Sequence, residues 1–116
     1  MLSDSDFGGD QARELLRALQ AMSSGDFSAR LPGDWTGLPG KIADTFNTIV
    51  TSNGRMAAEL ERVGELVGRE GKTRQRARFG GLGGQWLEME AGVNNLIEDL
   101  LRPTTEMTRA IAGVAQ

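Results

Sequence analysis

The feature that most constrains the fold is an internal repeat, in which two stretches of the chain follow the same plan. The first covers residues 25–50 and the second covers residues 71–97, and each begins with a glycine. A helix-like segment precedes each glycine, and a further helix-like segment contains a repeated asparagine, Asn47 or Asn94. The spacing from glycine to asparagine is 22 residues in the first copy and 23 in the second. A repeat of this kind defines a unit that recurs and stacks, here a helix, a connector and a second helix.

Composition limits how such a unit can be stabilised. Of the 116 residues, 39% are hydrophobic and only 5% are aromatic, so the core is aliphatic and modest in size. A unit of under about 50 residues rarely folds alone without disulfides, metal or a partner subunit. The chain has no cysteine and no histidine, which excludes disulfides and removes the commonest metal ligand and general base. We therefore expect partner chains to supply stability, and we predict no catalytic residue, no cofactor and no metal.

Net charge and hydropathy limit the classes of partner and the cellular location that we expect for this chain. The formal net charge of −3 gives the whole chain no attraction to nucleic acid or to anionic lipid. No apolar run approaches the roughly 18 residues that a membrane span needs. Residues 1–10 contain three aspartates and no basic residue, unlike a signal peptide. We expect a cytoplasmic fragment of a larger protein, without a direct membrane span, whose parent is either soluble or membrane-attached.

The first unit is expected to begin after a disordered lead-in, residues 1–10. A helix is predicted from about Asp10 to Ser24, because apolar residues recur there on one face, and Gly25 is suited to end it. The apolar residues on this face include Leu15, Leu19 and Met22. The connector, residues 25–37, is too apolar for a free loop, and its predicted anchors recur every four residues. These anchors are Phe27, Leu31 and Trp35.

The length of this connector favours parallel helices. About 13 extended residues reach roughly 40 Å at 3.3 Å each, whereas a 15-residue helix is only about 22 Å long. The connector can therefore run back along the first helix and start the next helix beside it. An antiparallel helical hairpin would need only about 2–5 residues.

The strongest periodicity follows the first connector. Residues there keep a 4-3 spacing over more than three heptads, which is typical of a coiled coil. The series consists of Ile42, Phe46, Ile49, Asn53, Met56, Leu60, Val63 and Val67. The second copy repeats the series 47 residues later, with Met89, Val93, Leu96, Leu100, Pro103, Met107, Ala110 and Val114. Apart from the two polar or helix-breaking positions, we predict that these residues form the core of a helical bundle.

Both series pass through residues that disfavour a helix, which we treat as junctions. Asn53-Gly54 is a strong turn signal; a helix-interior glycine costs about 1 kcal/mol and an interior proline, such as Pro103, about 3 kcal/mol. A hairpin at Asn53-Gly54 is the competing interpretation, but it would leave the heptad phases on either side unrelated. Because the phase is kept, we predict one long helix from about Lys41 to Arg69 and another from about Trp86 to the C-terminus, each weakened or bent near its middle.

The second connector, residues 71–84, differs from the first in composition. It contains five glycines, and its predicted anchors are Thr73, Ala77 and Phe79. Three arginines alternate with these residues, which places the arginines on one side of an extended segment. They are Arg74, Arg76 and Arg78. The favoured interpretation is a solvated edge paired with acidic residues of neighbouring helices; the alternative is a basic ribbon for phosphates.

Several of these stretches resemble a HAMP domain, the parallel coiled-coil relay of signalling proteins. Residues 22–32 are similar to the helix end and connector start of the family, with Phe27 and Leu31 at its two anchor positions, and residues 46–50 match its second helix. The second unit resembles the divergent units of poly-HAMP arrays in hybrid histidine kinases, through residues 85–86 and 93–97. The family usually opens its second helix with an Asp-Glu-x-Gly motif; the stretch here, residues 37–40, keeps the glycine and lacks the acid.

The resemblance and the two heptad series together predict one architecture. It is all-α, with parallel homodimeric four-helix bundles stacked end to end through continuous helices. The first HAMP-like unit covers residues 11–57, the second 56–102, and residues 103–116 form the first helix of a truncated third unit. The resemblance implies a signal relay between an input domain and an output domain of the same parent chain, such as a histidine kinase. A static coiled-coil dimerisation spacer and a protein-binding adaptor are the alternatives.

Overall fold

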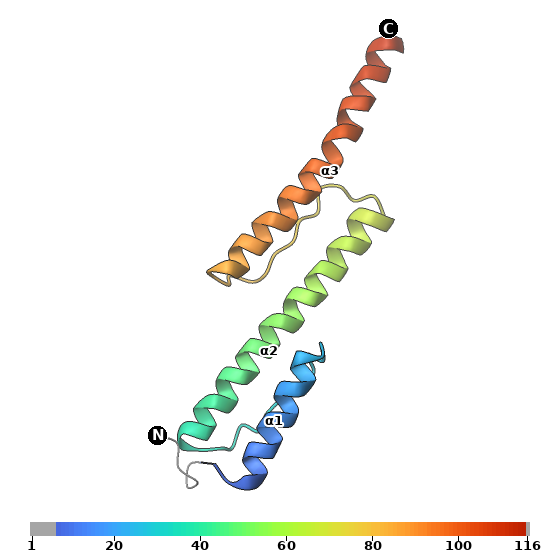
Figure 1. The fold of residues 1–116 in the computed structure, drawn as a ribbon. Helices are drawn as coiled ribbons and strands as arrows, with labels where there is room; N and C mark the ends of the chain where they lie inside the picture. The colour runs from blue at the N-terminus through green and yellow to red at the C-terminus, as the bar shows by residue number, and fades with distance from the viewer. Residues whose placement is uncertain (1–6, 116) are drawn as a thin grey trace. The chain divides into compact units, whose positions relative to one another are not determined.

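The described part of the chain is entirely helical and irregular, without a β-strand. The computed structural model describes the backbone of residues 7–115 and the side chains of residues 7–101. In chain order its elements are α1 (Gly9–Ser23), α2 (Gly37–Val63), the π-helix η1 (Gly64–Arg69) and α3 (Gln85–Ala115) (Figure 1). The all-α prediction is therefore confirmed. In this part of the chain, no helix has both the length and the apolar character that crossing a membrane requires.

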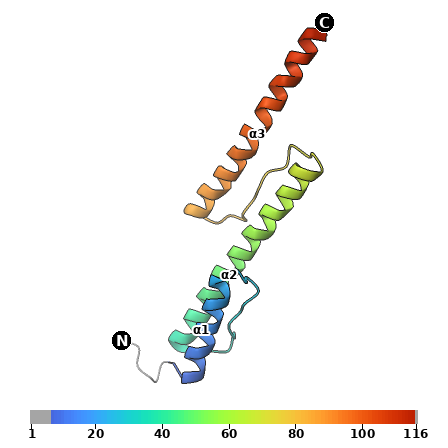
Figure 2. The ribbon, with the colours of Figure 1, turned by 45° about the vertical axis from the view of Figure 1, so that its right-hand side comes forward.

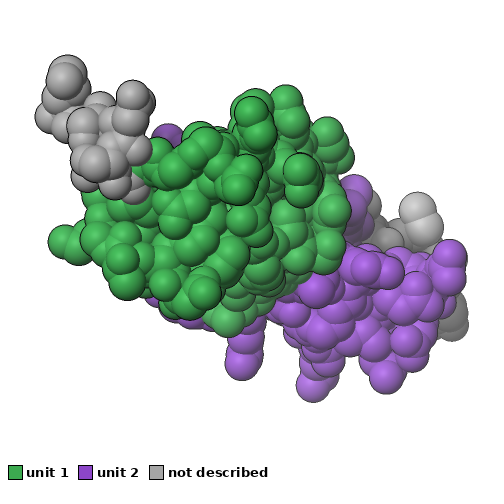
Figure 3. All heavy atoms as spheres, turned by 90° about the horizontal axis from the view of Figure 1, so that it is seen from below, with its two compact units in different colours: residues 1–56 green, residues 57–116 purple. Residues whose placement is uncertain are grey.

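The chain divides into two compact units, residues 1–56 and residues 57–116, which are coloured separately in Figure 3. Residues of both units belong to α2. The helix passes Asn53-Gly54 without a break, so the competing hairpin interpretation is wrong. The backbone of α3 is likewise helical through Pro103, whose side chain lies outside the described residues.

In the first unit, α1 is closed at both ends by local hydrogen bonds. The backbone N–H of Gly8 donates to Oε1 of Gln11 at 3.3 Å, a partner that a helix N-terminus needs because its first N–H groups have none within the helix. At the other end Gly25 adopts a φ of 93°, and the N–H of Asp26 donates to the carbonyl of Ala21 at 2.9 Å. This is the left-handed glycine stop that the sequence predicts. Residues 9 and 10 are helical, which corrects the end of the predicted lead-in; residues 1–6 of that lead-in lie outside the described residues.

Within this unit α1 and the start of α2 run parallel, and the connector returns along them, as both ribbon views show (Figures 1 and 2). The connector meets α2 closely at one point. A Cβ atom added to Gly40 would lie 2.3 Å from the carbonyl oxygen of Trp35, which is far inside van der Waals contact. Only glycine therefore fits where the backbone after Trp35 turns into α2.

The second unit repeats this plan with a different helix end. The last turns of α2 and η1 run parallel to the start of α3, with an extended connector between them (Figure 1). The predicted α-helix to Arg69 is wrong for its last six residues, which wind as a π-helix. The N–H of Glu70 donates to the carbonyl of Glu65 at 3.1 Å, and that of Lys72 to Leu66 at 2.8 Å. Two glycines among these six residues weaken the preference for an α-helix, and π-turns are rare without such a cause.

Candidate functional site

The first unit carries an apolar face that the described part of the chain leaves uncovered. A hollow of about 420 Å³ opens between α1 and α2. The side chains of Leu19 and Ile49 are 41% and 44% exposed there, and Leu38 is 45% exposed. The structure thus brings six predicted core residues of α1 and α2 together around one opening. The hollow is lined by Leu15, Leu19, Met22, Leu38, Lys41, Ile42, Thr45, Phe46 and Ile49.

The neighbouring face of α2 packs against its own chain, which the heptad series did not predict. Ala43 and Val50 are fully buried, and Phe46, between them, is only 4% exposed. They form one cluster with Ala18 of α1 and Leu31 of the connector. The signal was present, since residues 43, 46 and 50 have helical 3-4 spacing. The heptad series contains neither Ala43 nor Val50, and Phe46 is the residue that the two faces share.

The connector of the first unit is held by apolar anchors and by one amide. Leu31 is 4% exposed, while Phe27 and Trp35 are half-buried against the same cluster. The N–H of Leu31 donates to Oδ1 of Asn47 at 2.8 Å, and Nδ2 of Asn47 donates to the carbonyl of Leu31 at 2.9 Å. A single side chain of α2 thus satisfies both backbone groups of the central anchor. We call this pair of hydrogen bonds a clasp.

The second unit has the same clasp. The N–H of Ala77 donates to Oδ1 of Asn94 at 2.8 Å, and Nδ2 of Asn94 donates to the carbonyl of Ala77 at 3.1 Å. Leu31 and Ala77 each lie six residues after the leading glycine of their connector. The repeated asparagines that mark the two copies in the sequence therefore have one structural role, which their spacing alone did not predict.

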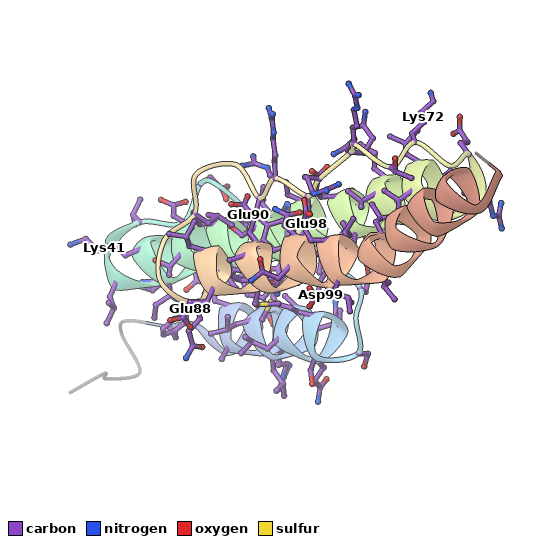
Figure 4. The ribbon with its side chains drawn as sticks, turned by 90° about the horizontal axis from the view of Figure 1, so that it is seen from above. Lys41, Lys72, Glu88, Glu90, Glu98 and Asp99 are labelled. Atoms are coloured by element: carbon purple, nitrogen blue, oxygen red, sulfur yellow. The ribbon has the colours of Figure 1, made fainter. Side chains whose placement is uncertain are left out.

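Around the clasp, the second unit adds polar contacts to its buried apolar anchors. Of the predicted anchors, Ala77 and Phe79 are 1% and 2% exposed, whereas Thr73 is exposed. The N–H of Phe79 donates to Oε1 of Glu90 at 2.7 Å. Figure 4 shows Glu90 and Glu98 on the connector side of α3, with Glu88 on another side.

Two arginines brace this connector through carboxylates. Arg62 of α2 donates to both carboxylate oxygens of Glu59, at 2.7 and 2.9 Å, and also to the carbonyl of Arg76 at 2.9 Å. Arg76 in turn pairs with Glu98 of α3. The N–H of Arg78 donates to Glu59 as well. The Arg76–Glu98 pair fits the predicted edge paired with acidic residues of neighbouring helices.

These contacts shift the pKa values of Glu59 and Arg62. The hydrogen bonds from Arg62 hold the pKa of Glu59 below its ordinary value, and the N–H and charge of Arg78 act in the same direction. The carboxylate of Glu59 raises the pKa of Arg62 in turn. In the first connector, hydrogen bonds from the hydroxyl and the N–H of Ser28 lower the pKa of the exposed Asp26. Both carboxylates are therefore held in their charged form.

The apolar residues of the second unit are divided between inside and outside. Val63 and Ile97 are 4% and 7% exposed, while Val67 and Val93 are half-buried, as is Met56 at the end of the first unit. A further group of predicted core residues is uncovered, with exposures of 38% to 66%. These are Leu60, Met89, Leu96 and Leu100. The side chain of Met107 lies outside the described residues, and Asn53 and Gly54 are half-buried within α2.

The uncovered apolar side chains of this arrangement are suited to association with another surface. No group of three or more acidic residues is placed to hold a metal ion among the residues that the structure describes. The prominent features are uncovered apolar side chains and connectors fixed by hydrogen bonds. No family model matches the chain. No solved structure matches it either.

Proposed function

We propose that the chain is a signal-relay module that works as a parallel homodimer, in which each unit contributes two helices to a four-helix bundle. The observation that carries the proposal is the uncovered apolar face of the first unit. Six residues that the heptad and helix patterns single out surround its open hollow, and a second copy of the same face is a natural cover for it. Parallel helices within each unit support a parallel arrangement of the two chains.

The magnitude of the apolar burial favours a dimer that uses both units. Full burial of a Leu or Ile side chain is worth about 1.5–3 kcal/mol, so covering half of one is worth roughly half of that. Leu19, Leu38 and Ile49 are each a little under half exposed, and six such side chains in two copies give on the order of 5–9 kcal/mol. Association costs about 4–15 kcal/mol. The first unit alone is therefore marginal, and the uncovered residues of the second unit would supply the rest.

The relay itself rests on the difference between the units and on the resemblance to HAMP domains. Both connectors have the same clasp and buried apolar anchors, but only the second is also braced by ionic contacts, which Arg62 and Arg76 make. Two packings that differ by a few kcal/mol can be biased by a neighbouring domain with a similar differential energy. In this proposal an input domain shifts the balance between two helix packings in one unit, and the next unit changes its packing in response. An output domain such as a histidine kinase, in a cytoplasmic part of the parent chain, then receives this conformational change.

A static dimerisation spacer is the second candidate, and one observation favours it. The helix α2 is unbroken through Asn53-Gly54, where a switch would most simply bend. A spacer and a relay share the same dimer and differ only in whether a change in one unit reaches the other.

Disulfide cross-linking separates the two, because the chain has no cysteine of its own. Single cysteines would be placed along residues 42–67 of the full chain, and the pattern of interchain cross-links would be measured with and without Asn94→Ala in the second unit. Asn95→Ala is the matched control, since Asn95 is exposed on the same helix. A relay predicts that Asn94→Ala changes the pattern within residues 42–56 and that Asn95→Ala does not. The same pattern in all three proteins would favour the spacer.

A further inference from the structure

The second unit contains a polar hollow that the proposed relay does not use. Its volume is about 590 Å³, which is ample for a phosphate or a pyrophosphate. It lies between the last turns of α2 and the second connector. Its lining consists of Glu59, Arg62, Arg74, Gln75, Arg76 and Arg78.

The charges around this hollow are unbalanced. Arg62 pairs with Glu59 and Arg76 pairs with Glu98. The guanidinium groups of Arg74 and Arg78 make no hydrogen bond or ion pair within the described residues, and both residues are exposed. Four guanidinium groups thus face two carboxylates. The hydrogen bond from Arg62 is the main cause of the lowered pKa of Glu59, and the charge of Arg78 contributes in the same direction.

The backbone geometry explains why these arginines share one hollow. Ala77 and Phe79 are buried, and alternate residues of an extended segment point to opposite sides. The clasp of Asn94 and the contact of Glu90 fix that alternation at residues 77 and 79. Arg76 is tied down by Glu98, and Arg62 by its bond to the carbonyl of residue 76. If the connector were only a solvated edge, these arginines would not need to lie around one opening, as they do here.

We propose that this hollow is a binding site for a small, multiply charged oxyanion of the phosphate class, taken from solution. Arg74 and Arg78 would be its primary ligands, because the planar guanidinium fork matches phosphate oxygens with two parallel hydrogen bonds. Arg62 and Arg76 would add positive charge to the site while each keeps its ion pair with a carboxylate. The site lies wholly within the second unit, between α2 and the second connector, so it does not depend on the dimer.

The test is calorimetric titration of the full chain with pyrophosphate at constant ionic strength, set with sodium chloride. The variant Arg74→Gln/Arg78→Gln is expected to bind at least about tenfold more weakly than the unchanged protein. Arg17→Gln/Arg55→Gln removes the same charge from exposed positions of the first unit and is expected to change affinity by less than about twofold. Arg74→Lys/Arg78→Lys keeps the charge without the fork, and an intermediate loss is expected.

Several results would overturn the proposal. One is an absence of binding to the unchanged protein at about 10 mM pyrophosphate; another is an equal loss of affinity in both glutamine variants, which would indicate general charge attraction. Binding to vesicles that contain phosphatidylglycerol, without binding to free pyrophosphate, would assign the arginines to a membrane surface instead. Backbone amide NMR shifts provide the location, with changes expected at residues 74–78 and none at Lys41.

Discussion

The asparagine clasps give the sharpest test of the structure. Asn47→Ala removes the two hydrogen bonds to Leu31, of 2.8 and 2.9 Å, and leaves both backbone groups without a partner beside a side chain that is only 4% exposed. An intramolecular hydrogen bond contributes about 0.5–1.5 kcal/mol net, so the two together are worth roughly 1–3 kcal/mol. Alanine is a better helix former than asparagine by about 0.5 kcal/mol, which hides part of the loss.

A matched control removes that complication. Asn95 lies beside Asn94 in α3, and its exposed side chain makes no hydrogen bond within the described residues. Asn95→Ala therefore carries the same gain in helix propensity without the loss of a clasp, and its free energy of unfolding should stay within about 0.5 kcal/mol of the unchanged protein. Measured against it, Asn47→Ala and Asn94→Ala should each lose roughly 1–3 kcal/mol. The assay is urea unfolding followed by circular dichroism at one fixed protein concentration, because dimer stability depends on concentration.

Asn47→Asp refines the test, since a carboxylate accepts from the N–H of Leu31 but has no proton for the Leu31 carbonyl. It should be at least as destabilising as the loss of one hydrogen bond. If Asn47→Ala and Asn95→Ala unfold at the same urea concentration, the clasp contributes nothing and the physical account of the connectors is wrong. A fully stable Asn47→Asp would contradict it in the same way.

Three further predictions follow from single residues. Gly40→Ala should destabilise the first unit by more than about 1 kcal/mol in thermal unfolding, because its Cβ would lie 2.3 Å from the backbone oxygen of Trp35; an unchanged Tm would contradict that contact. Gly54→Ala, in the same helix, should stabilise by about 0.5–1 kcal/mol, because its Cβ would meet Phe27 only at an ordinary 3.5 Å; a loss of stability would contradict the unbroken α2. The pKa of Glu59 is lower in the folded chain than the unfolded value of 4.5, so its contribution to the free energy of unfolding is full above pH 4.5 and is lost as the pH falls through the folded pKa. Glu59→Gln should therefore flatten the decline of stability below about pH 4.5. An unchanged dependence of stability on acid pH would refute this.

The periodicity of the sequence predicted the course of the backbone well, because it indicates which residues lie on one face of a helix. The heptad phase kept through Asn53-Gly54 indicated one helix, and α2 is unbroken there. The leading Gly25 indicated a left-handed stop, and its φ is 93°. The alternation in the second connector placed Ala77 and Phe79 inside and Arg74 and Arg78 outside, as the burial confirms.

The contacts between segments were harder to predict, because they depend on which side chains meet across the chain. Asn47 and Asn94 stood out as repeated letters, but nothing in their spacing shows that an amide meets a backbone carbonyl sixteen or seventeen residues away. The heptad series of α2 contains the outward-facing Ile49 but neither Ala43 nor Val50, so it did not indicate that these two residues are buried within the unit. The π-helix has no periodic signal at all, since it occupies only six residues.

The central claim is that the uncovered apolar faces close on a second copy of the chain. Sedimentation equilibrium of the full chain over a range of micromolar concentrations measures this directly, because it gives the mass in solution without a label or a cross-link. The proposed dimer predicts a mass of about twice 12.5 kDa, with dissociation only on dilution. A mass of 12.5 kDa at every concentration, with the secondary structure intact, would contradict the dimer and with it the proposed relay.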